Sequence, residues 1–304
     1  MPVRVYTPDE FTQDNPPALD LHDARVLAEG DSWFTLGTLN LFQATNLLNT
    51  LVFQRSVGVV NCAYPGHTLR HMADDATAGG DFDTLLRQPG FAGTWDAVLL
   101  SAGGNDLIDA ARQRPVGQDG QPAPLADRLL RTPAEADPAA SGPARLLSEP
   151  GWARLAGYLR ANLERLVAVR DAGPNAGIPL CLHTYAVPTV WRCGTVGATD
   201  GWLWPSFEAY GIPEAERAGV TAELFERLRA LWLRADAASG HPDALPAVHV
   251  FDSATQVPLL PPDPARRKGP SGDWINEIHP SARGYRKLGR GFGAFVEKHW
   301  GQAG

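Results

Sequence analysis

The sequence predicts an α/β fold in which helices cover both faces of a parallel sheet. Short apolar runs alternate with amphipathic segments along the chain, the pattern of strands joined by crossover helices. The runs are apolar almost throughout, as is typical of strands buried on both faces. Because such crossovers are right-handed, the carboxyl ends of the strands should meet at one edge. No repeat or boundary divides the 304 residues, so we expect one domain spanning 1–304.

Five apolar runs account for the expected parallel sheet. Each has the length of a strand and is bounded by turn-forming residues. The predicted strands are residues 25–29, 56–61, 96–101, 178–184 and 247–252.

Amphipathic segments fill the connections between these strands. In residues 151–171 apolar side chains recur at the i, i+3, i+4, i+7 spacing of a helix. Helices are also expected at 81–88, at 214–238 and from Pro280 onward, since proline is favoured in a first helical turn. The segment after the first strand carries a shorter helical stripe, formed by Leu39, Phe42, Leu48 and Leu51.

Two segments fit neither pattern. Residues 109–149 are rich in Pro, Ala, Gly and Asp with little apolar periodicity, which predicts a long polar insertion. Residues 185–212 form an aromatic loop, which is either a satellite core over the sheet or the wall of an apolar pocket. Its large rings are Trp191, Trp202, Trp204, Phe207 and Tyr210.

Composition narrows the classes of partner. The formal net charge is −7, and the only basic run is Arg266-Arg267-Lys268. Phosphate binding needs clustered cations, so we expect neither nucleic acid nor an anionic membrane surface as partner. The cysteines Cys62, Cys181 and Cys193 lack the CxxC spacing of a zinc site and are an odd number, which suggests no disulfide framework. A reduced compartment fits this usage best.

The amino-terminal residues bear on location. Residues 1–23 lack the cationic start and apolar core of a secretory signal, and no apolar run approaches the length of a membrane span. We therefore expect a cytoplasmic protein without a membrane span.

Residues suited to acyl transfer follow three of the predicted strands. The first strand stops at Gly30-Asp31-Ser32, Gly66 follows the second, and Asn105 follows the third. His279 lies far along the chain, in the segment before the last helix. Ser32 is the candidate nucleophile and His279 its general base. The Ser32 N–H, the Gly66 N–H and the Asn105 amide are candidate donors to an oxyanion.

Each of these residues also has a purely structural explanation. A serine or glycine after a strand commonly forms a turn, and asparagine there commonly caps a helix. We interpret His183, within a predicted strand, as a core histidine, and Asp106 as a residue that holds loops by hydrogen bonds. The functional interpretation rests on the blocks taken together.

The four blocks resemble those of the SGNH hydrolases, also called the GDSL esterase and lipase family. Gly30-Asp31-Ser32 matches the first block, Gly66 the second, Gly104-Asn105-Asp106 the third and His279 the last. The resemblance implies a three-layer α/β/α sandwich of flavodoxin type around a five-stranded parallel sheet. It also implies hydrolysis of small carboxylic esters through an acyl-enzyme, without metal or other cofactor.

The chain departs from the family pattern at Asn276, where the family usually has an aspartate three residues before its histidine. An asparagine carbonyl can fix the His279 tautomer but carries no charge to stabilise an imidazolium. Three other arrangements remain open: Asp273 folds back onto the ring, the backbone carbonyl of Asn276 orients it in a Ser-His dyad, or Glu277 reaches it.

This departure keeps a second class of function in view. A non-catalytic ligand-binding module could retain the fold and its pocket. Within enzymes, the alternatives are a carbohydrate O-acetyl esterase, a lysophospholipase or thioesterase, and an acyltransferase. We expect the substrate pocket to be formed by aromatic side chains that follow two strands, namely Trp33, Phe34, Tyr185 and Trp191.

Overall fold

A computed structural model describes residues 1, 3–35, 45–87, 95–194, 200–263, 265–266 and 270–300 of the chain. The described residues form a six-stranded sheet in which every neighbouring pair is parallel, in the order β1-β3-β2-β4-β5-β6. The strands are β1 (Arg4–Tyr6), β2 (Ala24–Gly30), β3 (Val57–Asn61), β4 (Ala97–Ser101), β5 (Leu180–His183) and β6 (Val248–Phe251).

The predicted α/β class and the five predicted strands are confirmed, but the expected strand number is one short. The additional strand, β1, has three residues and pairs with β3 at the edge of the sheet. Its Arg4 is exposed and only Tyr6 is fully buried, so the segment lacks the continuous apolar run by which the inner strands are recognised.

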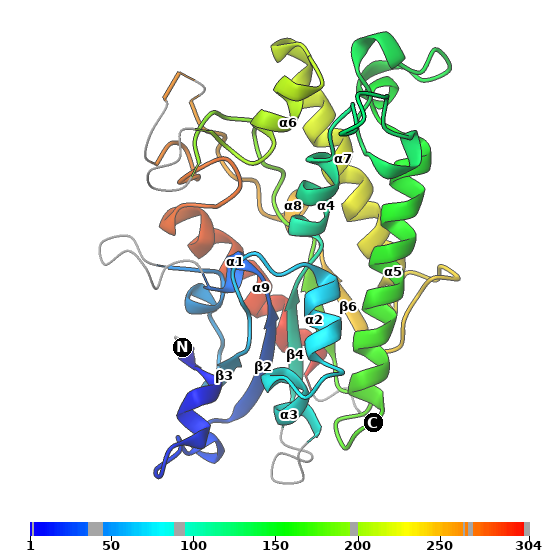
Figure 1. The fold of residues 1–304 in the computed structure, drawn as a ribbon. Helices are drawn as coiled ribbons and strands as arrows, with labels where there is room; N and C mark the ends of the chain where they lie inside the picture. The colour runs from blue at the N-terminus through cyan, green and yellow to red at the C-terminus, as the bar shows by residue number, and fades with distance from the viewer. Residues whose placement is uncertain are drawn as a thin grey trace.

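Helices lie on both faces of the sheet, as predicted. Figure 1 shows α2, α3 and α5 in front of the strands and α9 behind them, which gives three layers. The helices are α1 (Ser32–Thr35), α2 (Leu69–Asp75), α3 (Asp81–Arg87), α4 (Gly104–Ala111), α5 (Glu149–Asp171), α6 (Trp204–Ala209), α7 (Glu214–Ala235), α8 (Ser253–Gln256) and α9 (Ala282–His299).

Side-chain caps define where the two best-marked helices begin. The Ser148 hydroxyl accepts a hydrogen bond from Gly151 N at the start of α5, and Ser281 does the same for Gly284 N in α9. The last helix therefore begins two residues after Pro280. Of the stripe expected after the first strand, Leu39 and Phe42 lie outside the described residues, while Leu48 and Leu51 are buried around a 3₁₀ turn, Leu48–Thr50.

The 109–149 segment is built on short 3₁₀ turns, Leu125–Asp127, Pro133–Glu135 and Gly142–Leu146. An isolated bridge joins Leu130 to Leu147, and both side chains are buried. The Arg128 guanidinium binds both carboxylate oxygens of Glu135. These contacts hold the segment together internally, and it packs beside α5 and α7, beyond the carboxyl edge of the sheet (Figure 1).

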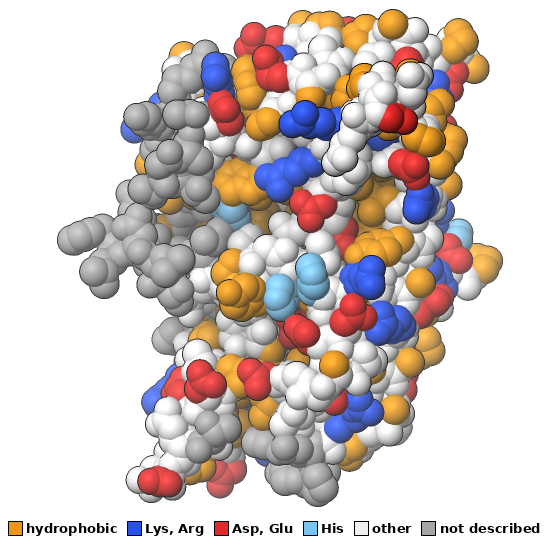
Figure 2. Space-filling model, viewed as in Figure 1, with side chains coloured by type: hydrophobic (Ala, Val, Ile, Leu, Met, Phe, Trp, Pro, Cys, Tyr) orange, Lys and Arg blue, Asp and Glu red, His pale blue; other side chains and the backbone are white. Residues whose placement is uncertain are grey.

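The carboxyl ends of the strands point toward the loops that hold the predicted functional residues. β2 runs into α1, and β4 is followed by α4, which begins at Gly104. Within the ranges described, no helix is both long and apolar enough to cross a membrane. On the face drawn in Figure 2, acidic and basic side chains are interspersed.

Candidate active site

Ser32 is the first residue of α1, directly beyond the end of β2. The turn depends on a close approach at Gly30: a Cβ at that position would lie 2.9 Å from the Ser101 Cβ and 3.1 Å from the Phe34 ring. A side chain there would push β2 away from the neighbouring end of β4. Glycine therefore allows the strand to end where the Ser32 hydroxyl reaches the site.

Ser32 and His279 are in direct contact although 247 positions separate them. The Ser32 Oγ lies 2.8 Å from the His279 Nε2. The ring is buried, with 3% of the residue exposed, and burial lowers the pKa of His279 to about 3. The imidazole is therefore neutral at neutral pH, as a general base must be.

The Asn276 side chain orients the His279 ring. Its Oδ1 accepts hydrogen bonds from the backbone N–H groups of Ile278 and His279, at 3.2 and 2.9 Å. Two such donors identify this atom as the carbonyl oxygen. The ring Nδ1, 2.9 Å from the same oxygen, must then carry the proton and donate it. The Nε2 lone pair is consequently left to accept the Ser32 hydroxyl proton.

None of the three other arrangements considered for orienting His279 is found. The backbone carbonyl of Asn276 is not used, because its side-chain carbonyl takes that place. Asp273, which was a candidate catalytic residue, does not contact the ring. Its buried carboxylate accepts hydrogen bonds from Arg283 Nε, Lys287 Nζ and Leu260 N. Its oxygens are held by these cations rather than by the imidazole.

Glu277 does not orient the ring either. Its carboxylate points away from His279 and accepts hydrogen bonds from four backbone N–H groups of the aromatic loop, those of Trp191, Trp202, Leu203 and Trp204. Burial raises the pKa of Glu277 to about 7, against the opposing effect of these donors.

A buried polar network supports the turn that carries Ser32. The Asp31 carboxylate accepts hydrogen bonds from Trp33 N at 2.9 Å, Ser101 Oγ at 2.8 Å and Tyr185 OH at 2.5 Å. The Ser101 hydroxyl in turn faces His183 Nε2 at 3.0 Å, while His183 Nδ1 accepts from Tyr185 N. His183 is thus a satisfied core histidine, as predicted. Burial raises the pKa of Asp31 to about 6.

Two of the three predicted oxyanion donors lie at the site. The Ser32 N–H has no hydrogen-bond partner among the described residues, so it is available to a ligand. The Asn105 amide donates one hydrogen bond to the His67 carbonyl at 2.9 Å, and its second N–H remains for an oxyanion. Both residues line the same cavity.

Gly66 does not line that cavity. It is exposed and has a φ of +84°, and a Cβ there would meet nothing within 4 Å. Glycine is therefore required here by the left-handed turn, and the Gly66 N–H is the predicted oxyanion donor that does not lie at the cavity.

A small cavity beside Ser32 is partly open to solvent. Of the residues predicted for the substrate pocket, Trp33 and Tyr185 line this cavity. Side chains from α4, α7 and two loops complete it, and none of the lining residues belongs to the 109–149 segment. The lining consists of Asp31, Ser32, Trp33, Gly104, Asn105, Ile108, Tyr185, Ala186, Pro188, Phe225 and Ile278.

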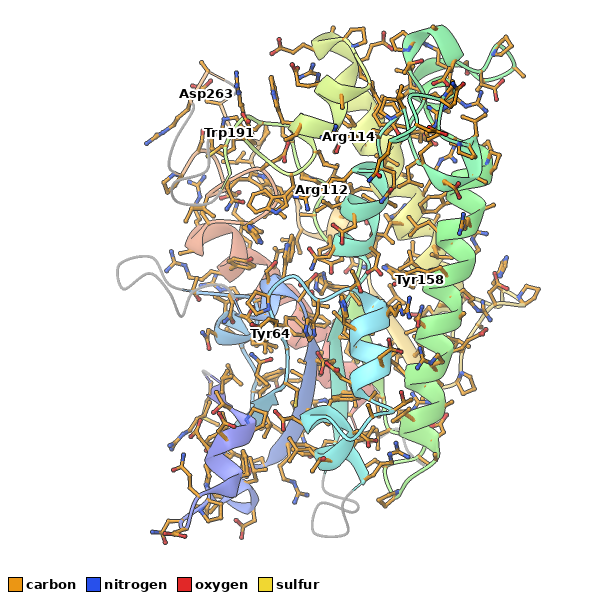
Figure 3. The ribbon with its side chains drawn as sticks, viewed as in Figure 1. Tyr64, Arg112, Arg114, Tyr158, Trp191 and Asp263 are labelled. Carbon is orange, nitrogen blue, oxygen red and sulfur yellow. The ribbon has the colours of Figure 1, made fainter. Side chains whose placement is uncertain are left out.

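Phe34 and Trp191, also predicted for the substrate pocket, do not line this cavity. Phe34 is fully buried, with its ring 6.1 Å from that of His183, because consecutive residues of α1 point in different directions. Trp191 lies near Asp263 in the loops above the sheet (Figure 3), and its indole N–H donates to the Arg266 carbonyl. It belongs to the packing of the aromatic loop.

The sequence did not single out Trp202 for the site. Its half-buried ring stands edge-on to the His279 imidazole, with centroids 5.2 Å apart and an interplanar angle of 80°. Of the five large rings of the aromatic loop, Phe207 and Tyr210 are buried as core, and none lines the cavity, which this loop reaches only through Tyr185, Ala186 and Pro188. The apolar residues Ile108, Phe225 and Ile278 were also missed, because single apolar positions do not reveal which cavity they face.

Asp106 holds loops together, as predicted. Both of its carboxylate oxygens accept from Leu69 N, at 2.9 and 3.2 Å, and this ties α4 to the start of α2. Burial raises the pKa of Asp106 to about 6. In the described parts of the chain, no group of three or more His, Cys, Asp or Glu side chains is arranged to hold a metal ion.

No protein-family model matches the chain, and no curated protein is significantly similar to it. Among solved structures, it is similar to an extracellular lipase from Streptomyces rimosus, with 15% identity, 91% of this chain and 99% of that chain covered, and a TM-score of 0.49. It is also similar to a GDSL-like lipase from Bacteroides thetaiotaomicron, with 12% identity, coverage of 93% and 91%, and a TM-score of 0.43.

A third similar structure is an acetylxylan esterase from Geobacillus stearothermophilus, with 13% identity, coverage of 93% and 98%, and a TM-score of 0.42. These three similar structures are thus two lipases, one of them GDSL-like, and one acetylxylan esterase.

Proposed function

We propose that this protein is a serine ester hydrolase of the SGNH type. The observation that carries the proposal is the contact of the Ser32 Oγ with the His279 Nε2, at 2.8 Å. The Asn276 carbonyl fixes the ring tautomer in which that nitrogen accepts the hydroxyl proton. A serine hydroxyl becomes an effective nucleophile when a positioned base removes its proton.

Acylation follows from this geometry. The Ser32 oxygen attacks the ester carbonyl carbon while its proton passes to the His279 Nε2. The resulting oxyanion lies where the Ser32 N–H and the free Asn105 N–H can donate to it; a donor of this kind typically contributes roughly a hundred- to a thousandfold in rate. The protonated ring then returns its proton to the leaving alkoxide as the carbon–oxygen bond breaks.

Deacylation uses the same residues. A water molecule takes the place of the departed alcohol and gives one proton to His279 as its oxygen attacks the acyl carbon. Collapse of the second tetrahedral intermediate breaks the bond to Ser32, which recovers its proton from the ring. The products are a carboxylic acid and an alcohol.

The neutral Asn276 sets the strength of this base. In serine proteases, replacing the triad aspartate by asparagine costs about 10⁴-fold in kcat, because the ring adopts the wrong tautomer. Here the backbone N–H groups of Ile278 and His279 hold the amide oxygen toward the ring, so the tautomer is correct. What is missing is only the negative charge that would stabilise an imidazolium.

The cavity favours esters with an apolar acyl group. Its apolar lining includes Ile108, Phe225 and Ile278, while the polar groups gather around Ser32. Among the similar structures are lipases and an acetylxylan esterase, and the apolar lining supports the former kind of substrate over an acetylated sugar.

A non-catalytic binding module was considered because Asn276 stands where the family usually has an aspartate. The hydrogen bond from His279 Nδ1 to the Asn276 side chain weakens that reason. The two proposals differ in turnover. We expect the protein to hydrolyse p-nitrophenyl esters from acetyl to octanoyl, with higher kcat/KM for the longer acyl groups.

Replacement of the nucleophile tests the assignment. Ser32→Ala should abolish turnover while the circular dichroism spectrum and thermal unfolding stay as in the wild type. Ser239→Ala, at an exposed serine of the loop after α7, is the matched control and should retain full activity. Turnover by Ser32→Ala at the wild-type rate would refute the assignment.

A further inference from the structure

Glu277 is a buried carboxylate that binds backbone instead of cations. With 1% of the residue exposed, it accepts hydrogen bonds from Leu203 N at 2.7 Å and Trp204 N at 3.1 Å. It accepts two more from Trp202 N and Trp191 N. No ion pair links it to a cation in the described ranges. Every hydrogen bond of this carboxylate therefore holds the aromatic loop.

The loop passes directly over the carboxylate. A Cβ at Gly201 would lie 2.2 Å from a Glu277 oxygen, so only glycine lets the chain come this close. The Glu277 N–H also donates to the Cys193 carbonyl at 3.0 Å. Both the backbone and the side chain of Glu277 therefore bind the aromatic loop. The position of Trp202 is therefore fixed by its neighbours on the chain.

The fixed residue touches the catalytic base. The Trp202 ring stands edge-on to the His279 imidazole. His279 belongs to the same short segment as Asn276, which binds the imidazole, and Glu277, which binds the aromatic loop. Asn276 and Ser32 occupy the two ring nitrogens, and Trp202 packs against the imidazole itself. This contact limits how much water reaches the ring.

We propose that Glu277 is a positioning residue that pins Trp202 against the His279 imidazole and so keeps one side of the base dry. The inference rests on the proposed function in that it takes His279 to be the base. It adds a residue that touches neither Ser32 nor the cavity, yet sets the environment of the proton acceptor.

The proposal has a measurable consequence, because burial lowers the pKa of His279 to about 3. The side chains that contact this ring, those of Ser32, Asn276 and Trp202, are all uncharged. On and near the packed segments, the ionisable groups of the described residues are Glu277, Asp31, Cys193, the Arg192–Asp200 ion pair, and Asp273 with its cations Arg283 and Lys287. Water that enters beside the ring should therefore raise its pKa toward the ordinary value of about 6.5.

The test is an NMR titration of the His279 Hε1 signal, assigned among the eight histidines by its loss in His279→Gln. We expect Trp202→Ala and Glu277→Gln to raise the His279 pKa by at least about one unit. In Glu277→Gln, the NH₂ group of the new amide takes the place of one acceptor oxygen and faces the loop N–H groups that this oxygen bound. Trp202→Phe, which keeps a ring, and Asp200→Asn, which breaks only the Arg192 ion pair of the same loop, should titrate as the wild type.

The kinetic readout is the ratio of kcat/KM at pH 5 to that at pH 8. In Trp202→Ala and Glu277→Gln it should fall by the factor that the titrated His279 pKa sets, about tenfold for a pKa near 6, and it should stay unchanged in Trp202→Phe and Asp200→Asn.

Wild-type titration of His279 in both Trp202→Ala and Glu277→Gln would overturn the proposal. If Glu277→Gln does not fold, the contrast between Trp202→Ala and Trp202→Phe decides. The NMR experiment needs no turnover, so a wild-type protein without ester hydrolysis would refute the proposed function while the titration still tests this inference.

Discussion

Asp273 and Glu277 are two buried carboxylates on one short segment, and they are held in opposite ways. Asp273 binds two cations, Arg283 and Lys287, both from the last helix. Glu277 binds four backbone N–H groups of the aromatic loop. Between them lies Asn276, the uncharged residue that binds His279.

The comparison shows how charge is distributed around the base. One carboxylate fixes the segment to α9 and the other fixes a loop to the segment, while the ring itself receives a neutral partner. A buried neutral imidazole with no adjacent anion resists protonation, which agrees with the lowered pKa of His279. The two acids thus tie the segment to its neighbours, and neither contacts the His279 ring, whose pKa is lowered by burial.

Removing the neutral partner should have the largest effect on activity. Asn276→Ala takes away the acceptor of the His279 Nδ1 proton, so the ring loses its tautomer and orientation. We expect kcat to fall by about 10²–10⁴-fold, measured with an aryl ester. Asn276→Asp is the paired variant: it keeps the acceptor and adds a charge, so it should keep or raise kcat. An Asn276→Ala enzyme with wild-type kcat would contradict the assigned role.

Removing the charge of Asp273 should act on stability instead of chemistry. Asp273→Asn weakens contacts to Arg283, Lys287 and Leu260 N, and should cost about 1–3 kcal/mol of unfolding free energy at neutral pH. The half-exposed cations can be rehydrated, which limits the loss. Urea unfolding measures it, with exposed Asp263→Asn as control. A sharp loss of kcat at unchanged stability would restore Asp273 to the catalytic set.

The sign of the pH dependence further separates the two carboxylates. Burial opposes the effect, yet hydrogen bonds from Lys287, Leu260 N and Arg283 hold the pKa of Asp273 below its usual value. Its stabilisation is therefore present above about pH 4 and lost as the pH falls through the lowered pKa. The advantage of the wild type over Asp273→Asn should shrink toward acid pH.

Glu277 should behave in the opposite sense. Because burial raises its pKa to about 7, its contribution is fully present below about pH 4.5 and is lost as the pH rises through 7. The stability difference between the wild type and Glu277→Gln should thus become smaller from pH 5 to pH 8 in urea unfolding. A difference that grows over this range would show that the carboxylate is the better-tolerated form.

The sequence predicts the strands and the Ser32–His279 pair better than it predicts the contacts of the surrounding side chains. Buried strands such as β4 are apolar almost throughout, and Ser32 follows directly from another buried strand, so both were recognised. β1 was not, because three edge residues leave no pattern. Ser32 and His279 were found through residue type and order along the chain.

The remaining contacts depend on folding that the local sequence does not encode. That the Asn276 oxygen faces the ring depends on the backbone turn at Ile278 and His279. That Glu277 binds Trp202 depends on a contact across 75 positions. The choice between Trp33 and Phe34 as a pocket residue depends on how α1 is rotated against β2. Each of these is set by packing among distant segments.

The central claim is that His279 activates Ser32 as a nucleophile, and covalent labelling tests it most directly. A fluorophosphonate probe should form a single adduct, which peptide mass spectrometry should locate on Ser32. The adduct should form far more slowly in Asn276→Ala and be absent in Ser32→Ala. A folded wild-type protein that remains unlabelled, or is labelled at another serine, would contradict the account.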